Sequence, residues 1–480
     1  MILPLHQTSK LRPRGGIRWN LTLPILLVFA ASLAFLAWLD HGPPMAIPLR
    51  EPGTDHTEGV SGRTQTNPVL AGQLTTTMEP VSDLPGSWPQ FRGSQRDGSW
   101  AGTGSVSRAW GPGGPRRLWQ AEVGEGYAGP AVAASRVYVM DHDREKQQDA
   151  LRCLSLETGK EMWRFAYPMA VKRNHGMSRT VPTVSGEVVV AMGPKCHVAC
   201  CDAKTGALKW GMDLVQEEGA TVPPWYTGQC PLIDGELVIL APGGKETMLM
   251  AVEVAGGNVR WRTPNPLGWK MTHSSVMRTE INGVSQYVYC ASGGVIGVRA
   301  DDGRVLWQTT DWKIGIATVP SPVPIPGGRL FLAGGYNAGS MMLRVEQADG
   351  TWSANAEFRL KPEVFGSTQH TPVFHADRLY GIRPDGDLAC LDLEGHLQWS
   401  TGQLRFGLGP FLMVNDLILA LAEGGQLSLI EPGSTECRIL AQADILEGRE
   451  AWAPMAFAEG RLLLRDLRQL VCLDVAGAPP

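Results

Sequence analysis

Two adjacent thiols, Cys200 and Cys201 in the run VACCDAKTGALKW, are the residues of this sequence best suited to covalent chemistry. Neighbouring cysteines can close a disulfide or act as a redox pair. Cys196 and His197 stand just before them, which nearly gives the ligand spacing of a zinc site. The run alternates like a β-strand, however, and a strand sends successive side chains to opposite faces. We therefore predict no metal site here.

The same thiols have a second interpretation, which we favour. Four cysteines fill one slot of a repeated phrase: Cys153, Cys200, Cys390 and Cys472. A small buried residue is expected at that position of the repeat, and cysteine packs as a small apolar group. Cys201 would then occupy a slot that other copies fill with Leu. The chain has nine cysteines, an odd number, so at least one thiol is free or paired elsewhere.

Three further runs carry imidazole, guanidinium and indole groups, which bind ligands through hydrogen bonds, charge and stacking. They are KRNHGMSRTVPT with His175 and Arg179, WKMTHSS with Trp269 and His273, and FGSTQHTPVF with His370. Each run stands just before an expected inner strand of the fold derived below. We therefore expect these side chains near the rim of a central channel, as candidate ligand contacts. The alternative is a polar loop whose His and Arg side chains bond to backbone carbonyls.

The elements that position these residues recur along the chain. Seven tryptophans are separated by 44, 47, 51, 46, 45 and 47 residues: Trp119, Trp163, Trp210, Trp261, Trp307, Trp352 and Trp399. This period is typical of propeller blades or solenoid repeats. Five of them stand four residues after a glycine, whereas Trp352 follows Gly350 by two and indicates a deviant turn. The same offset from Gly433 reaches Cys437, which we interpret as a degenerate copy.

Eight short alternating strands accompany these phrases and predict the fold class. The turns between them use Asp and Thr side chains and the positive φ of Gly. The run QLVCLDV, residues 469–475, ends before its Trp, while RRLWQAEV, residues 116–123, supplies a Trp strand with no preceding phrase. If the two pair, the ring has no free edge. The sequence therefore predicts an all-β, eight-bladed β-propeller of four-stranded antiparallel blades, with structural blade residues at the seven tryptophans.

The N-terminal part predicts a membrane anchor. Residues 19–39 carry no charge, which suits the roughly 20 residues that a helix needs to cross a bilayer. Basic residues precede them, so the rest of the chain is expected on the periplasmic or exported side of an inner membrane. The expected organisation is a basic flank over 1–18, a transmembrane signal-anchor helix over 19–39, a disordered linker over 40–83, an ordered lead-in over 84–116 and the propeller over 117–480.

The phrase CDAKTGALKW resembles the pyrroloquinoline-quinone-like (PQQ-like) β-propeller repeat, found in quinoprotein alcohol dehydrogenases and in BamB-like proteins. The resemblance covers residues 117–475. The run WPQFRGSQRDG and the closing segment are similar to membrane-anchored or secreted members from planctomycete-type bacteria. BamB-like relatives imply a role in outer-membrane protein assembly. A lipoprotein anchor of that kind would need an N-terminal Cys, and this chain has none before Cys153.

Quinoprotein relatives imply PQQ and calcium as cofactors, and an adjacent cysteine pair like Cys200 and Cys201 lying over the quinone. The sequence lacks the Trp-Asp-rich signature of those enzymes and any Cys-x-x-Cys-His haem motif. A net charge of −4 and a pI near 6.2 exclude a general attraction to nucleic acid. We predict a non-enzymatic scaffold that binds an exported or membrane protein or a ligand. The alternatives are a PQQ-dependent oxidoreductase and a sensor of a small ligand or sugar.

Overall fold

The computed structural model describes residues 26–33, 35, 66–172, 176–448 and 450–477. The chain forms two units, Met1–Glu51 and Pro52–Pro480. In the first unit, residues 26–33 and 35 are helical, and most of the segment 19–39 lies outside the described residues. Within the described part of the chain, no helix has the length and hydropathy needed to span a bilayer.

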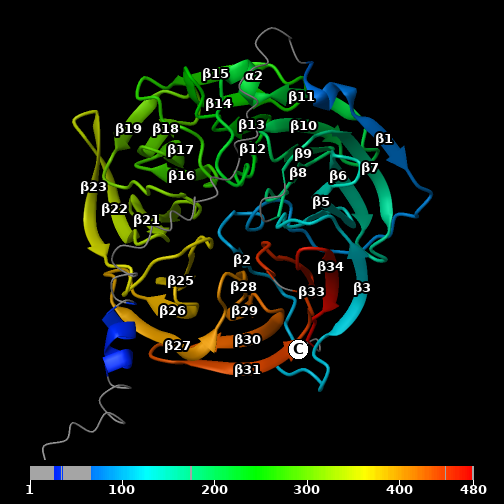
Figure 1. The fold of residues 1–480 in the computed structure, drawn as a ribbon. Coiled ribbons are helices and arrows are strands. Elements are labelled where there is room, and N and C mark those ends of the chain that lie inside the picture. The colour runs from blue at the N-terminus through cyan, green and yellow to red at the C-terminus, as the bar shows by residue number, and fades with distance from the viewer. Residues whose placement is uncertain (1–25, 34, 36–65, 173–175, 449, 478–480) are drawn as a thin grey trace, which may run out of the picture. The chain divides into compact units, whose positions relative to one another are not determined.

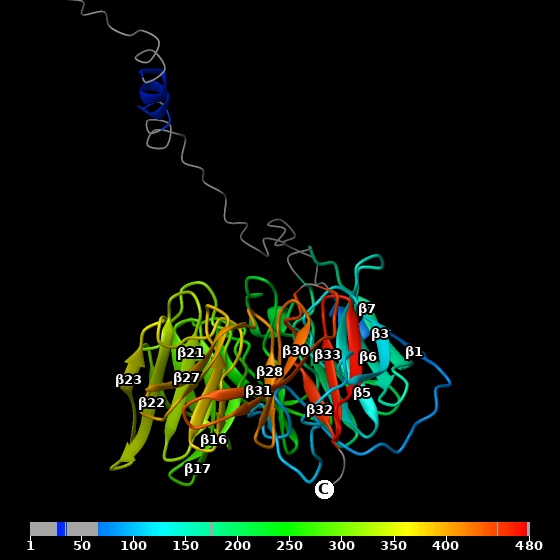
Figure 2. The same cartoon turned by 90° about the horizontal axis from the view of Figure 1, so that it is seen from below.

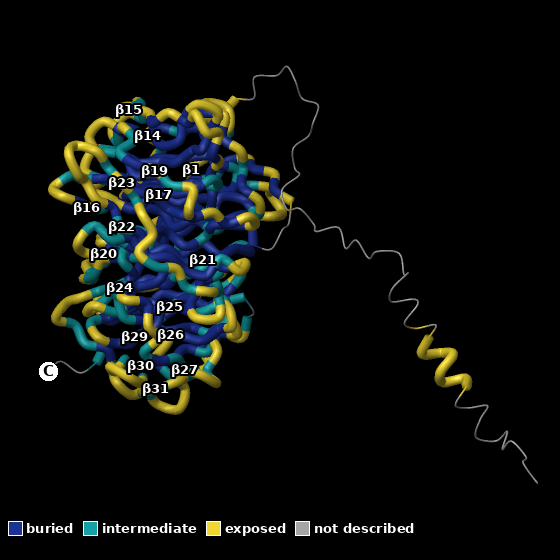
Figure 3. Tube along the Cα trace, turned by 90° about the vertical axis from the view of Figure 1, so that its left-hand side faces the viewer, coloured by how far each residue is buried: buried dark blue, intermediate teal, exposed yellow. Residues whose placement is uncertain are grey.

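The second unit contains eight antiparallel sheets arranged around a central axis, which confirms the predicted eight-bladed propeller (Figure 1). Viewed edge-on, the strands of each blade run between the two faces of the ring (Figure 2). Exposed residues gather mainly in the connecting loops, while the strands contain most of the buried ones (Figure 3). Seven hydrophobic clusters occupy the spaces within and between blades.

Blades one to four follow one another along the chain, each ordered from the innermost to the outermost strand. Blade one contains β4 (Ala131–Ala133), β5 (Arg136–Asp143), β6 (Gln148–Ser155) and β7 (Glu161–Pro168). Blade two contains β8 (Thr183–Ser185), β9 (Val188–Met192), β10 (His197–Asp202) and β11 (Leu208–Asp213). Blade three contains β12 (Leu232–Asp234), β13 (Leu237–Leu240), β14 (Thr247–Glu253) and β15 (Val259–Pro264). Blade four contains β16 (Met277–Ile281), β17 (Val284–Ala291), β18 (Gly294–Arg299) and β19 (Val305–Thr309).

Blades five to eight complete the ring. Blade five contains β20 (Val323–Ile325), β21 (Arg329–Gly334), β22 (Gly339–Ala348) and β23 (Thr351–Leu360). Blade six contains β24 (Val373–His375), β25 (Arg378–Ile382), β26 (Asp387–Leu391) and β27 (Leu397–Arg405). Blade seven contains β28 (Phe411–Val414), β29 (Leu417–Leu421), β30 (Gln426–Pro432) and β31 (Cys437–Asp444). Blade eight contains β32 (Ala456–Ala458), β33 (Arg461–Arg465), β34 (Gln469–Asp474) and β3 (Arg116–Glu122). A short helix, α2 (Leu214–Glu218), follows blade two.

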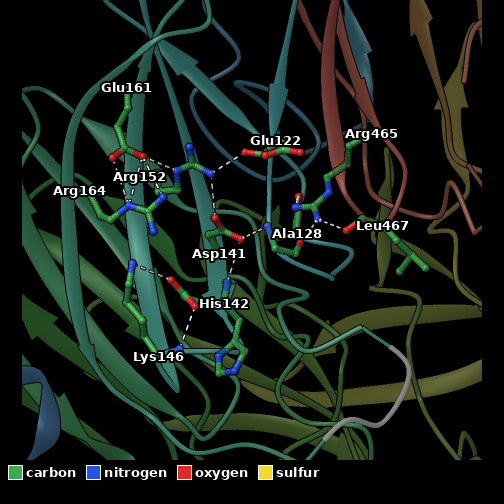
Figure 4. A network of polar contacts seen from close by, with 12 residues as sticks. Glu122, Ala128, Asp141, His142, Lys146, Arg152, Glu161, Arg164, Arg465 and Leu467 are labelled. Atoms are coloured by element: carbon green, nitrogen blue, oxygen red, sulfur yellow. Dashed lines mark hydrogen bonds and ion pairs between the residues drawn. The ribbon is translucent and has the colours of Figure 1, made fainter.

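Blade eight joins the two ends of the propeller sequence. Its outermost strand β3 pairs with β34, with Trp119 opposite Cys472. Polar contacts tie this blade to blade one (Figure 4). Arg152 donates to the carbonyl of Glu122 and to the carboxylate of Asp141, while Asp141 accepts from the backbone N–H of Gly124. These contacts hold the seam of the ring.

Four of the repeated tryptophans pack onto a glycine of the next blade. The indole of Trp163 in blade one donates its Nε1 hydrogen to the carbonyl of Ala203 in blade two, at 3.2 Å. The turn glycine of blade two, Gly206, lies against the same ring, where a Cβ atom would come within 2.6 Å of it. The same packing of glycine on indole joins Trp119 to Gly159, Trp210 to Gly257 and Trp261 to Gly303. Only glycine leaves space for the indole of the preceding blade.

Two blades depart from the predicted repeat. In blade five, Trp352 lies near the start of the long strand β23, opposite Gln347, and Phe358 takes the register position beside the bulge that tryptophan holds elsewhere. In blade seven, Ala441 rather than Cys437 has that position. The physical reason is hairpin length. The outer hairpins of these blades extend beyond the usual turn, so the offset from the glycine no longer locates the equivalent residue.

The segment before the propeller is more ordered than the sequence indicates. Within the predicted linker 40–83, Pro68–Ala71 form a 3₁₀ turn, η1, and Gln73–Thr76 form β1, which pairs with the outer edge of β7. Val69 is fully buried, and its side chain packs against Gly211 of β11. One buried anchor and a row of backbone hydrogen bonds are enough to dock a polar segment, and such bonds leave no mark in its composition.

Candidate functional site

The lead-in segment crosses the central channel. Trp88 bridges to Val132 of β4, and the carbonyl of Pro89 accepts from Val184 of β8. Ser99–Trp100 then form β2, which pairs in parallel with β28 of blade seven. In Figure 1 β2 lies at the centre of the ring. The lead-in, which the sequence analysis expected to be ordered, therefore also closes the channel. That second role was not predicted from the sequence.

Two arginines of the lead-in fasten it to the channel wall. Arg92 donates to the carbonyls of Thr371 and Pro372 in front of β24, at 2.6 and 2.8 Å, and to two carbonyls of its own loop. Arg96 donates to the carbonyls of Cys230 and Pro231 in front of β12. Burial lowers the pKa of both guanidinium groups to about 10, so they stay charged near neutral pH.

Above this floor lies a cavity of about 460 Å³, within the range of small-molecule sites. Its lining comes from the lead-in and from loops of the blades. Aromatic rings are prominent in the lining: Trp88, Phe91, Tyr127, Trp225, Tyr336, Phe411 and Trp452. Within each blade the chain runs from the inner to the outer strand, so every connection back to the next inner strand returns on one face. This topology brings residues from distant parts of the sequence into one site.

Arg179 is the centre of the polar part of the cavity. Its guanidinium carbon lies 5.0 Å from the ring centroid of Tyr127, and its Nε donates to the carbonyl of Trp225. Tyr127 in turn stacks on Trp452 with the ring centroids 5.0 Å apart and donates its hydroxyl hydrogen to Glu450. Burial, followed by the bond to Glu450, raises the pKa of Tyr127, so the phenol stays protonated. Burial lowers the pKa of Arg179 to about 10, which leaves it cationic near neutral pH.

Two histidines line the cavity in their neutral form. Burial, with a contribution from the charge of Arg179, lowers the pKa of His273 to about 3. Burial likewise lowers the pKa of His370 to about 4. Because the Nε2 of His370 lies 2.9 Å from the carbonyl oxygen of Leu408, that nitrogen carries the hydrogen and donates it. The Nδ1 atom of His370 is therefore an acceptor.

The cavity brings together three of the residues singled out in the sequence: Arg179, His273 and His370. Trp269 is instead buried between blades three and four, where it packs against Gly293. His175 lies outside the described residues. Sequence reasoning did not identify Tyr127, Trp225 or Trp452. These three residues could have been found from their position in the sequence, because each lies in a segment that precedes an inner strand.

The cysteine pair lies away from this cavity. Both thiols are on β10, the third strand of its blade, and neither lines the cavity. Cys201 packs in the cluster between blades one and two, whereas Cys200 packs in the cluster between blades two and three. All nine cysteines are unpaired thiols. The strand alternation that argues against a metal site also separates these two side chains.

The cofactors implied by quinoprotein relatives fit this site only in part. PQQ is a planar anion, and Arg179 with the surrounding rings could receive one carboxylate and the ring system. Calcium requires six to eight oxygen ligands, largely carboxylates. The described lining contains no Asp or Glu. No group of three or more His, Cys, Asp or Glu side chains among the described residues is placed to hold a metal ion. The site does not fit the calcium form of the cofactor.

Comparisons with known proteins agree with the fold. The model of the family described as outer membrane protein assembly factor BamB matches residues 102–264 and 147–401, more than half of the chain. Among curated proteins, none matches the sequence. The structure of BamB from Moraxella catarrhalis has 14% identity and a TM-score of 0.49, covering 75% of this chain and 99% of that one.

Two enzyme structures are also similar. A europium-containing methanol dehydrogenase has a TM-score of 0.59 at 13% identity, with 81% of this chain and 90% of that one covered. The quinohemoprotein alcohol dehydrogenase from Comamonas testosteroni has a TM-score of 0.57 at 11% identity, with 83% and 82% covered. At such identities the likeness shows the fold alone, so the function has to be argued from the channel cavity.

Proposed function

This chain belongs to the BamB family of PQQ-like β-propellers, and from that premise we propose that it is a non-enzymatic scaffold that binds a small ligand in its channel and a protein partner on its surface. One observation carries the proposal. The channel is closed by the chain's own lead-in and ends in a cavity lined by aromatic rings, two engaged guanidinium groups and two neutral imidazoles. Such a lining suits binding, whereas hydrolytic or redox chemistry would call for a carboxylate pair, a metal or a quinone site.

The ligand-binding part is tested by a thermal-shift screen of the full chain in detergent. The screen should include sugars, aromatic acids, aromatic amines and PQQ with calcium. Because a ligand that binds only the folded state raises its stability, a binder at a hundred times its Kd adds about 2.7 kcal/mol. A ligand of the cavity should lose its effect when Tyr127→Ala and Trp452→Ala are combined. If no compound of any class shifts the unfolding temperature, the ligand-binding part of the proposal is wrong.

The partner-binding part and the location form a second element of the proposal. Residues 19–39 would hold the propeller at the inner membrane on its exported side, where another exported or membrane protein could contact the loops and outer strands. Deletion of residues 1–39 should release the chain from membranes into the soluble fraction. Crosslinking followed by pull-down from membranes of the native host should then recover a specific partner with the full chain and lose it with this deletion variant.

A PQQ-dependent oxidoreductase is the second candidate, because both enzyme structures named above exceed a TM-score of 0.5. It would require that PQQ with calcium binds the purified chain and supports dye-linked oxidation of an alcohol. The scaffold proposal predicts no turnover under these conditions. Saturable quinone binding with turnover, abolished by Arg179→Met, would replace the scaffold proposal with the enzymatic one.

A further inference from the structure

We propose that the outer edge of blade one is an acceptor site for an extended segment of a protein partner, which enters by exchange with the chain's own residues 67–79. This inference rests on the partner-binding part of the proposed function. It adds the surface and the pattern of the segment that fits there: a small apolar residue, a glycine three positions later and a leucine two positions after the glycine.

The chain's own segment shows how a peptide binds at this edge. β1 lies on the outer side of β7 (Figure 1) and pairs with it in antiparallel register, with Thr76 opposite Trp163. The backbone N–H of Thr77 continues the row by donating to the carbonyl of Met162. Addition of a strand to a sheet edge is a common mode of peptide recognition, in which backbone bonds supply affinity and side-chain pockets supply specificity.

A notch in blade two accepts the apolar anchor of the segment. Val69 is fully buried, and a Cβ atom on Gly211 of β11 would come within 2.5 Å of its Cγ1 atom. The three atoms nearest to that Cβ position all belong to Val69 and Leu70, so the absent side chain leaves room for this segment. Gly211 directly follows the blade tryptophan, a position that other blades fill with larger residues: Gln120, Arg164, Arg262, Gln308 and Ser400. Blade two therefore differs from these blades at the point where the segment binds.

Two further positions of the segment fit by shape. Gly72 lies against the ring of Phe165 so closely that a Cβ atom on the glycine would overlap the ring. Leu74 packs beside the turn glycine of blade two, Gly206, where an added Cβ atom would lie 2.7 Å from the leucine Cδ1 atom. Neither contact involves a charge. Together with the buried anchor, these contacts define the pattern Val-x-x-Gly-x-Leu.

Protection of an exposed sheet edge does not by itself account for β1. Unpaired edges can template aggregation, and proteins often cover them. Among the described strands, however, the outermost strands of the other seven blades carry no strand on their free side. The ring therefore leaves such edges open. The edge that is occupied is the one beside the notch, which points to recognition rather than to general protection.

The contacts that hold the segment are few enough for exchange. Val69 is the one buried residue between positions 66 and 80, and all four residues of β1 are exposed. At the far end, Glu79 accepts from the hydroxyl of Thr158 and lies 3.5 Å from the Nζ atom of Lys160, and exposed contacts of this kind contribute little. Segments with few buried contacts open at a low cost in free energy. A competing strand of the same pattern could replace this one and leave the blades intact.

The test frees the edge and offers it a labelled peptide. In the full chain in detergent, Val69→Asp combined with Gly72→Val should release the segment, because an unpaired carboxylate would enter the notch and a side chain would overlap Phe165. Hydrogen exchange at residues 73–77 should rise while that of β6 stays unchanged. By fluorescence anisotropy, a labelled peptide of residues 66–79 should bind this released variant. It should bind the wild type at least roughly tenfold more weakly, because the tethered segment competes at a high effective concentration.

Peptide and acceptor variants then test the pattern. A peptide that keeps Val69, Gly72 and Leu74 but has Ser or Thr at the positions between them should retain its affinity. Peptides with Val69→Asp, Gly72→Val or Leu74→Asp should each bind at least roughly tenfold more weakly. Adding Gly211→Val to the released variant fills the notch and should weaken binding to the same extent. The matched control, Gln308→Val, places valine at the equivalent position of β19 and should change nothing.

The outcomes separate this inference from the proposed function. Unchanged exchange at residues 73–77 in the released variant, or no binding of the native peptide to it, would overturn the acceptor site alone. Binding of the native peptide but not of the one with substituted intervening positions would restrict the site to the chain's own segment and exclude a partner. Equal recovery of a partner by wild-type and Gly211→Val chains would place that partner elsewhere. If the wild type recovers no partner and no peptide binds, both proposals fail.

Discussion

Gly206 lies flat against the indole of Trp163, so close that a Cβ atom on the glycine would come within 2.6 Å of the ring. The two residues belong to different blades and to successive copies of the same repeated phrase. At this junction and at three others, one copy of the phrase supplies the ring and the next copy supplies the glycine that packs against it, which accounts for the spacing of Trp and Gly in these copies.

Replacing this glycine should destabilise the ring. Gly206→Ala places a methyl group into Trp163 and forces a residue with a side chain to adopt a φ of 79°. We expect the free energy of unfolding to fall by about 2–4 kcal/mol, from the sum of overpacking and backbone strain. Gly186→Ala is the matched control, because its φ is 57° but nothing lies within 4 Å of the added Cβ. It should cost about 1–2 kcal/mol. Denaturant unfolding of both variants measures the difference, and equal losses would contradict the interlocking role of Trp163.

The floor of the channel should depend on Arg92. Arg92→Met keeps the length of the side chain but leaves the carbonyls of Thr371 and Pro372 without their donor. We expect a loss of about 3 kcal/mol or more and new protease cleavage within the lead-in. Arg116→Met removes an exposed ion pair with Asp474 and should change stability by less than about 1 kcal/mol. A lead-in that stays resistant to protease in the Arg92 variant would show that the plug is held by other contacts.

Stability should fall on acidification between about pH 6.5 and pH 4. The folded state holds the pKa of His370 at about 4, below its usual value of 6.5, because the ring is buried. In this window the unfolded chain binds more protons than the folded one, so the free energy of unfolding rises with pH. The contribution should be about 1–3 kcal/mol, reduced by partial access of water to the cavity.

The variant His370→Gln tests that assignment, because glutamine can still donate to the carbonyl of Leu408 but does not titrate. Its unfolding free energy should depend less steeply on pH in this window. His396→Gln makes the same substitution at a histidine whose side chain is 76% exposed, and it serves as the comparison. A slope that is the same in the wild type and in the His370 variant would exclude this ring as its source.

One thiol should react in the folded protein and nine in the unfolded one. Cys437 is the only cysteine that is not buried, and all nine residues are described. Burial raises the pKa of Cys200 to about 12 and that of Cys201 further, so both thiols should resist alkylation until the chain unfolds. Titration with a thiol reagent in denaturant, without reductant, counts the thiols. A count of seven would reveal one disulfide and reopen a redox role for the adjacent pair.

The repeat in the sequence is strong enough to predict the ring but not every register within it. Tryptophan spacing locates the outer strand wherever the hairpin has its usual length. The spacing gives the wrong residue in blade five, because β22 and β23 each extend to ten residues. Phe358, not Trp352, has the register position beside the bulge. Locating the outer-strand residue by its distance from the turn glycine assumes a hairpin of constant length. The residues near the turn do not predict the longer hairpin.

Only those residues of the candidate site whose place follows from the order of strands and loops along the chain could be predicted from the sequence. Arg179, His273 and His370 could be placed because each stands just before an inner strand, and the topology then brings such segments to one end of the channel. The floor could not be predicted, since Arg92 meets Pro372 across 280 positions of sequence. Contacts of that range depend on closure of the whole ring, which no short window of residues encodes.

The pairing of β3 with β34 also constrains how the protein is made. The ion pair between Arg116 and Asp474 joins residues 358 positions apart. The strand β3, which is synthesised before the other strands of the eight blades, can therefore pair only after β34, the last strand, has been synthesised. Closing so long a loop is slow, and until then β3 lacks the strand with which it pairs. A nascent chain truncated before residue 469 should therefore behave as an aggregation-prone intermediate, one that chaperones would have to protect until synthesis ends.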